Sequence, residues 1–194
     1  MQEIISKKPI RSFATAAAWR IWLDKNQTKS DGLWLRIYKK DSGKKTVTYA
    51  EALDEALCYG WIDGQKQTYD AESFLQKFTP RRSKSMWSKR NREHTDRLIK
   101  EKRMTARGQS EIDAAKKDGR WEQAYDAAST MTVPEDFLKE LKKDKTAYAF
   151  FLTLSKANVY AISFRLQTAK KPETRAKRLN TILEMMKTGK KFHS

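Results

Sequence analysis

The sequence of 194 residues contains one cysteine, Cys58, and two histidines, His94 and His193. A single cysteine forms no disulfide within the chain and builds no cysteine-based metal site. A zinc site would need His94 with carboxylates alone, which is a weak ligand set. The glycine-rich phosphate-binding motifs and the GxSxG motif of serine hydrolases are also missing. We therefore expect neither a metal nor a cofactor.

Long hydrophobic runs are missing as well, and no stretch approaches the length of a membrane span. The segment Met1–Phe13 carries Lys7, Lys8 and Arg11, but no apolar stretch follows them. That arrangement argues against a secretory signal. We expect a cytoplasmic protein without a transmembrane segment.

Positive charge is abundant, with a formal net charge of +17. Such a field concentrates anions near the protein surface. The candidate partners are a phosphate-containing small molecule, a lipid headgroup or nucleic acid. The alternative is a lysine-rich surface that serves only solubility, because net charge bears on encounter and solubility more than on a specific activity.

The N-terminal half alternates between helical and strand patterns. Helices are predicted over residues 15–26 and 48–60, and Thr48 with Glu51 three residues later has the spacing of a capping box. Alternating apolar residues predict strands over residues 33–39, 61–69 and 73–79. These three strands predict a small antiparallel sheet.

The C-terminal half is predicted to be helical, with helices over residues 87–103, 110–117, 148–154, 157–168 and 172–187. Thr132 and Glu135 suggest a second capping box, and Pro172 suits a first helical turn. The fold class is thus α+β. We expect a flexible lead-in over 1–12, an α+β region over 13–128, and a helical region over 129–194 packed on it in one compact unit.

Charge is distributed unevenly along the chain. The segment Tyr49–Leu75 has six acids and one base, Gln76–Arg103 has eleven bases and three acids, and Arg165–Lys191 has nine bases and two acids. One interpretation is that the acidic segment pairs internally with its basic neighbours. The other is a cleft with one acidic and one basic wall, which suits a site that holds an anion and moves a proton.

Two basic segments precede predicted helices and are candidates for an anion site. The first comprises Arg81, Arg82, Ser85, Trp87 and Ser88. Arginines beside the first N–H groups of a helix are typical of phosphate sites, and Trp87 is positioned to stack on a base or sugar. Ser85 is predicted to cap a helix that begins near Met86, with Arg81 and Arg82 exposed. The alternative is a solvated loop with Trp87 in the core.

The second candidate anion segment comprises Lys170, Lys171 and Arg175 at the start of the last predicted helix. Arg175 lies four residues before Leu179 and so continues the core-facing stripe. The alternative is that Arg175 binds a carboxylate of the protein itself.

An enzymatic role has weak candidates in Glu51, Asp54 and Asp63, which could act as acid and base on a small phosphorylated or carboxylated substrate. The alternative is that acids early in a helix stabilise its dipole. Cys58 lies beside carboxylates, which raise a thiol pKa and disfavour a nucleophile. A general nucleic-acid binder would use Trp34, Trp61 and Trp87 for stacking, although tryptophans at amphipathic spacing are more often core.

Several strings resemble the bacterial YdeI/OmpD-associated, bacteriocin-protection family, namely residues 31–40, 48–64, 78–82, 87–91 and 169–175. The resemblance extends over roughly Phe13 to His193. It implies a bacterial protein linked to envelope stress and to tolerance of bacteriocins or cationic antimicrobial peptides, and the name suggests a relation to an outer-membrane porin. It implies no catalytic residues. A chain of this charge repels cationic peptides, so we expect protection to be indirect, through competition for anionic surfaces or through a phosphorylated ligand. Only the acidic segment Tyr49–Leu75 suits direct contact with a peptide.

Overall fold

The computed structural model describes residues 8–127 and 130–193. Most of the predicted lead-in, and the predicted boundary between residues 128 and 129, lie outside the described residues. The chain divides into two units, of which the first ends at Ala124 and the second begins at Tyr125.

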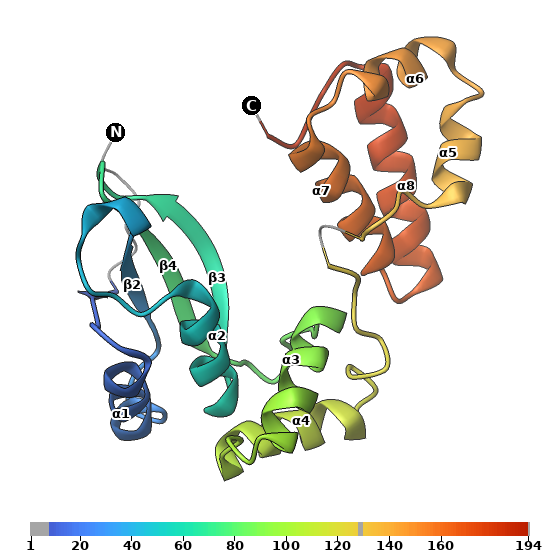
Figure 1. Ribbon diagram of the computed structural model, residues 1–194. Coiled ribbons are helices and arrows are strands. Elements are labelled where there is room, and N and C mark those ends of the chain that lie inside the picture. The colour runs from blue at the N-terminus through green and yellow to red at the C-terminus, as the bar shows by residue number, and fades with distance from the viewer. Residues whose placement is uncertain (1–7, 128–129, 194) are drawn as a thin grey trace. The chain divides into compact units, whose positions relative to one another are not determined.

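The first unit is built on a four-stranded sheet with the order β1-β2-β4-β3 (Figure 1). Its strands are β1 (Ile10–Arg11), β2 (Leu33–Tyr38), β3 (Trp61–Thr68) and β4 (Ser73–Pro80). The three long strands pair antiparallel, as predicted, and β1 pairs parallel with β2. The sheet is therefore mixed. The sequence pattern missed β1 because two residues are too short for an alternation to register.

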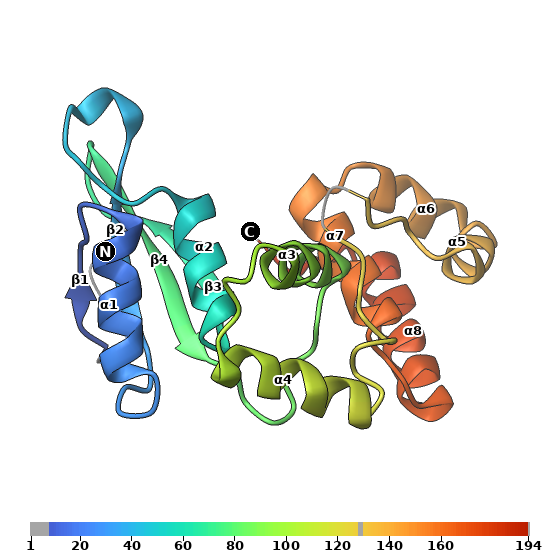
Figure 2. The ribbon, with the colours of Figure 1, turned by 60° about the horizontal axis from the view of Figure 1, so that its bottom comes forward.

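Helices α1 (Ala16–Asn26) and α2 (Tyr49–Cys58) lie beside each other against the sheet (Figure 2). Helix α2 begins at Tyr49 because Thr48 and Glu51 make the predicted capping box, with both reciprocal hydrogen bonds present. The principal core lies between these helices and the sheet. Its buried side chains include Trp19, Leu23, Leu33, Leu35, Leu53, Leu57, Trp61 and Phe78.

Helices α3 (Lys89–Lys100) and α4 (Ala106–Lys117) complete the first unit. The first begins two residues later than predicted, and the second four residues earlier. Thr105 caps α4 through the backbone N–H of Gly108. A smaller core lies here and contains Trp87, Ile112, Ala115, Trp121 and Ala124.

Gly108 permits the close approach of α4 to the end of α2. A Cβ atom at this position would overlap the carbonyl oxygen of Cys58 and the sulfur of Met104. Thr105 also donates a hydrogen bond from its hydroxyl to that carbonyl oxygen, at 2.6 Å. The contact between the two helices therefore depends on the missing side chain.

The second unit is helical and contains α5 (Glu135–Leu141), α6 (Lys145–Leu152), α7 (Lys156–Gln167) and α8 (Pro172–Lys187). The predicted start of α8 at Pro172 is confirmed. The core of the unit comprises Phe137, Leu141, Ala147, Phe151, Ile162, Leu166, Ile182 and Met186.

The predicted capping box of Thr132 and Glu135 is wrong. Pro134 occupies the position before α5, and no side chain caps that helix. The α+β class is confirmed, and every strand among the described residues lies in the first unit. No helix within the described ranges has both the length and the apolar composition needed to cross a membrane.

Candidate anion-binding site

Arg81, in the segment that follows β4, is the first of the residues predicted to bind an anion, and it is buried. Arg81 is 5% exposed, and its guanidinium carbon lies 3.5 Å from the centroid of the Trp87 ring. Its Nη1 also donates to the carbonyl oxygen of Met86 at 3.2 Å. The expectation of an exposed Arg81 is therefore wrong. Trp87 is 1% exposed and meets Trp121 edge to face, so its ring belongs to the core.

The serines of this segment have different roles from the predicted ones. Helix α3 begins at Lys89, and its cap is Ser88, whose hydroxyl accepts the N–H of Asn91 at 3.1 Å. Ser85 instead accepts the N–H of Arg82 at 2.9 Å, which closes a turn in the preceding loop. The predicted cap at Ser85 is therefore wrong, and of the two arginines only Arg82 is exposed.

Arg175 binds a carboxylate of the protein. Its two terminal nitrogens lie 2.5 Å and 2.9 Å from the oxygens of Asp136, which joins α8 to α5. The hydrogen bonds from Arg175 hold the pKa of Asp136 below its ordinary value. This geometry corresponds to the internal-carboxylate alternative. Lys170 and Lys171 are exposed just before α8, and Lys171 makes no side-chain cap.

The three candidate acids each have a partner of their own. Glu51 accepts hydrogen bonds from the backbone N–H and the hydroxyl of Thr48, the residue that caps α2. Asp63 accepts a hydrogen bond from the Tyr49 hydroxyl at 2.8 Å. Asp54 accepts from Arg97 at 2.7 Å and contacts Nδ1 of His94 at 3.0 Å.

Local environment sets the pKa of two groups on α2. Burial raises the pKa of Asp54, but the hydrogen bonds from Arg97 and His94 outweigh burial and leave it below its ordinary value. Burial, helped by the charge of Glu55, raises the pKa of the Cys58 thiol to about 11. Asp54 is therefore a carboxylate that holds α3 against α2, and Cys58 is a protonated thiol at neutral pH.

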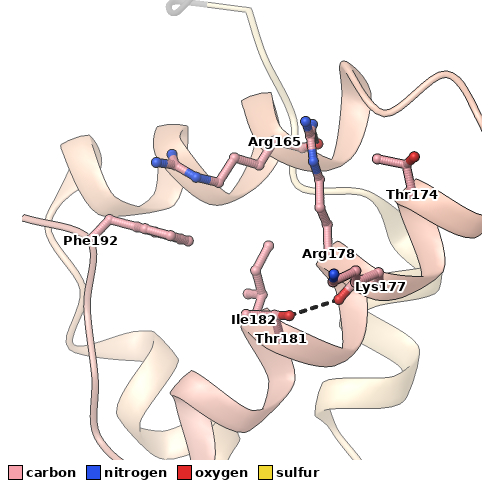
Figure 3. A pocket seen from close by; sticks show the side chains of 7 residues that line it. All are labelled: Arg165, Thr174, Lys177, Arg178, Thr181, Ile182 and Phe192. Carbon is pink, nitrogen blue, oxygen red and sulfur yellow. Dashed lines mark hydrogen bonds between the residues drawn. The ribbon is translucent and has the colours of Figure 1, made fainter.

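A pocket of about 360 Å³ lies between α7 and α8 in the second unit, and we call it the α7–α8 pocket (Figure 3). It is lined by Arg165, Thr174, Lys177, Arg178, Thr181, Ile182 and Phe192. Helical spacing places the α8 members on one face, since they recur at three- and four-residue intervals. Three cations and two hydroxyls thus surround an apolar floor, and none of the residues found to line the pocket is acidic.

The arginines of the α7–α8 pocket are held by contacts that leave their charge uncompensated. The guanidinium of Arg165 lies 3.9 Å from the ring centroid of Phe192, and Figure 3 shows it extending over that ring. Arg178 reaches from α8 to α7, where its Nη1 donates to the carbonyl oxygen of Arg165 at 2.7 Å and to Thr168 at 3.3 Å.

Lys177 completes the positive rim of the pocket. It is exposed, and within the described part of the chain neither Lys177 nor the two arginines forms an ion pair. A guanidinium and an ammonium remain charged at neutral pH, so the pocket presents a fixed positive field. The sequence signal for this site was the basic segment Arg165–Lys191, but the contribution of Phe192 was not visible in it.

The tryptophans proposed for nucleic-acid stacking are buried. Trp34 and Trp61 lie in the interior with Trp87, and none of the three presents a ring face to solvent. Base stacking on these side chains would require the core to open.

Comparison with protein families divides the chain at about the same place as the two units. Residues 11–111 match the family described as "Domain of unknown function (DUF8412)". Residues 130–189 match the family described as "Bacteriocin-protection, YdeI or OmpD-Associated". No curated protein and no solved structure matches the chain significantly.

The bacteriocin-protection match is narrower than the predicted span of Phe13 to His193. Of the strings that suggested the resemblance, only residues 169–175 lie within it, and the others lie in the DUF8412 match. The α7–α8 pocket lies within the bacteriocin-protection match except for Phe192.

Proposed function

We propose that this chain, a member of the DUF8412 family, is a non-enzymatic tolerance factor that binds an anion in the α7–α8 pocket. The family match of its second unit, to bacteriocin-protection, YdeI or OmpD-associated proteins, supports the tolerance role. The observation that carries the proposal is the convergence of Arg165, Lys177 and Arg178 on one pocket without a facing carboxylate. An anion would supply the missing negative charge.

The side chains of the pocket favour binding over catalysis. Arginine, lysine and threonine keep one protonation state at neutral pH, and a fixed charge suits the holding of a ligand. Ile182 and the ring of Phe192 give the pocket apolar surface beside its cations, and charge-assisted hydrogen bonds to an anion are stronger than neutral ones. Phe192 of the pocket lining is only partly buried, so a ligand with a short apolar group can remove more of its ring from water.

The charge of the chain shapes how protection would work. A protein of net charge +17 attracts anions and repels cationic peptides over a distance set by the ionic strength. Capture of a cationic bacteriocin by bulk electrostatics is therefore disfavoured. Protection that follows occupancy of the α7–α8 pocket by an anion agrees with the sign of the field.

The direct test is calorimetric titration of the full chain with inorganic phosphate and with hexyl phosphate. We expect both to bind, hexyl phosphate more tightly, with affinities that fall as salt is added. The Arg165→Gln/Lys177→Gln variant should bind about tenfold more weakly or worse, because two charge-assisted contacts are lost.

A matched control is Lys187→Gln combined with Lys190→Gln, which removes the same charge from α8 and the residues after it without touching the pocket. This control should bind like the original chain. Equal affinity in the pocket variant and the control, or an affinity indifferent to salt, would refute the anion site. In cells, the pocket variant should leave bacteria as sensitive to bacteriocin as cells without the protein.

A further inference from the structure

A second basic cavity lies in the first unit and is independent of the α7–α8 pocket. It has a volume of about 530 Å³ and forms where the end of β2, the 3₁₀ turn η1 (Lys40–Ser42), the loop after it and the start of α2 meet. We call it the lysine pocket. Its lining comprises Ile37, Tyr38, Lys39, Lys40, Lys44, Lys45, Thr46, Thr48, Tyr49 and Phe74.

The lysines of this pocket are only partly neutralised. Lys40 and Lys45 are exposed, and neither forms an ion pair within the residues that the structure describes. Lys44 lies 2.5 Å from the carboxylate of Glu72, and Lys39 donates to the carbonyl oxygen of Ala71 at 2.8 Å. The Lys44–Glu72 pair is about half exposed on both sides, so an incoming anion can replace the carboxylate at little cost.

The remaining wall of the lysine pocket is aromatic and apolar. Tyr49 is fixed at its hydroxyl by the hydrogen bond to Asp63. The ring of Tyr38 lies 5.1 Å from the ammonium nitrogen of Lys44, so charge and ring are adjacent. Phe74 on β4, which pairs with the buried Ile37 of β2, is partly exposed and adds apolar surface. A planar aromatic group buries apolar area against such a wall and gains from ring–ring contact.

The start of α2 does not by itself account for anion binding here. The capping box already places the Glu51 carboxylate on Thr48, where it occupies the first turn of the helix. A phosphate would therefore rely on the lysines, whose flexible stems bring point charges to oxygen atoms at several positions.

We propose that the lysine pocket binds a phosphate ester of an aromatic group, of which nucleoside phosphates are the common biological form. The phosphates pair with Lys40, Lys44 and Lys45, and the planar group packs against the aromatic wall. The site is separate from the anion site of the second unit, and either can fail alone.

The experiment is a titration of the full chain, without divalent cations, with ATP, with inorganic triphosphate and with adenosine. ATP should bind about tenfold or more tightly than triphosphate, because only ATP adds contact with the wall, and adenosine should bind far more weakly than either. Equal affinities for ATP and triphosphate would overturn the aromatic part of the proposal. Adenosine binding as tight as that of ATP would overturn the phosphate part.

Variants locate the site. Lys40→Ala/Lys45→Ala should weaken ATP binding about tenfold or more, whereas Lys25→Ala/Lys29→Ala, which removes two exposed lysines of the same unit, should change it little. Glu72→Gln should tighten binding, because it frees Lys44 and removes the competing carboxylate. A gain in affinity does not arise from misfolding, so unchanged or weaker binding by folded Glu72→Gln protein would count against the site.

The Arg165→Gln/Lys177→Gln variant separates this inference from the proposed function. It should retain ATP binding at the lysine pocket while losing hexyl phosphate binding at the α7–α8 pocket. Loss of ATP binding in that variant alone would assign the nucleotide to the second unit and overturn the present assignment.

Discussion

The α2–α3 contact of the first unit and the α7–α8 pocket of the second differ in how their positive charges are compensated. In the first unit, arginines of the α3 region face carboxylates of α2, with Arg97 on Asp54 and Arg103 on Glu55, each at 2.7 Å. In the second unit, the cations of the α7–α8 pocket face no carboxylate among its lining residues. The difference teaches that net charge does not locate a binding site. The candidate site differs from the paired region in that the residues lining it include no acid.

The acids of α2 explain why the first unit is self-compensated there. Asp54 and Glu55 lie on the helix that packs against α3, and both are partly or fully buried. Buried acids need partners, because an unpaired charge in the interior is costly. The internal-pairing interpretation of the acidic segment Tyr49–Leu75 is therefore confirmed for these two residues.

The largest loss of stability is expected when the close contact between α2 and α4 in the first unit is disrupted. Gly108→Ala should lower its free energy of unfolding by about 3 kcal/mol, because the new Cβ overlaps backbone that cannot move aside. Gly43→Ala is the control, since its Cβ would meet no atom within 4 Å and only the positive φ is strained. Urea unfolding followed by tryptophan fluorescence measures both. Similar losses in the two variants would show that the α2–α4 contact is looser than described.

The neighbouring arginines Arg81 and Arg82 test whether a buried cation of the first unit is structural. Arg81→Ala should cost about 2 kcal/mol, because it removes a hydrogen bond and the stacking partner of Trp87. Arg82→Ala should leave the unfolding free energy nearly unchanged, since Arg82 is exposed. The same denaturation curves report both values. A stable Arg81→Ala variant with weakened phosphate binding would restore Arg81 as an anion ligand.

Asp54→Asn should destabilise the first unit by about 1–2 kcal/mol at pH 7, since Arg97 and His94 lose a charged acceptor. The folded pKa of Asp54 is depressed, so its contribution is present above the ordinary aspartate value near 4 and is lost as pH falls through the folded pKa. The difference between variant and original chain should therefore shrink below about pH 4. Unfolding curves between pH 3 and pH 7 give the trend, and a difference that grows on acidification would contradict it.

The smallest effect is expected for the exposed ion pair of the second unit. Arg175 and Asp136 have side-chain exposures of 33% and 52%, so solvent screens their attraction. Asp136→Asn should cost no more than about 1 kcal/mol at neutral pH. Thermal unfolding at low and high salt measures it. A loss of stability as large as that of Asp54→Asn would show that the exposed ion pair of the second unit contributes as much as the partly buried pair of the first.

Sequence patterns predicted most of the fold because its signals are local. The alternation in β2, the capping box at Thr48 and the first-turn Pro172 each fix an element within a few residues. The two-residue β1 has no such signal, since two residues are too few to show an alternation, and only its pairing with β2 defines it. The spacing of Thr132 and Glu135 misled because Pro134, which has no N–H, stands between them at the cap position.

The sites were less predictable because they depend on partners across the fold. The spacing of Trp87 in the sequence was equally consistent with a core residue and with a ligand contact. The contact between its ring and that of Trp121 shows that it belongs to the core. The α7–α8 pocket depends on the contact between Arg165 and Phe192, which no local sequence pattern predicts. The cations and the acids were both visible in the sequence, but which carboxylate faces which cation was not.

One amide on α7 ties the end of the described chain to the α7–α8 pocket. The side-chain oxygen of Asn158 accepts the N–H groups of both Phe192 and His193 at 2.9 Å, and its nitrogen donates to the carbonyl oxygen of His193. Phe192 is a wall of the pocket, so ligand affinity and the docking of this segment are thermodynamically linked. A tag fused after His193 that pulls this segment away from Asn158 would lower the affinity of the α7–α8 pocket for its ligand. A bound anion would in turn oppose the release of the segment.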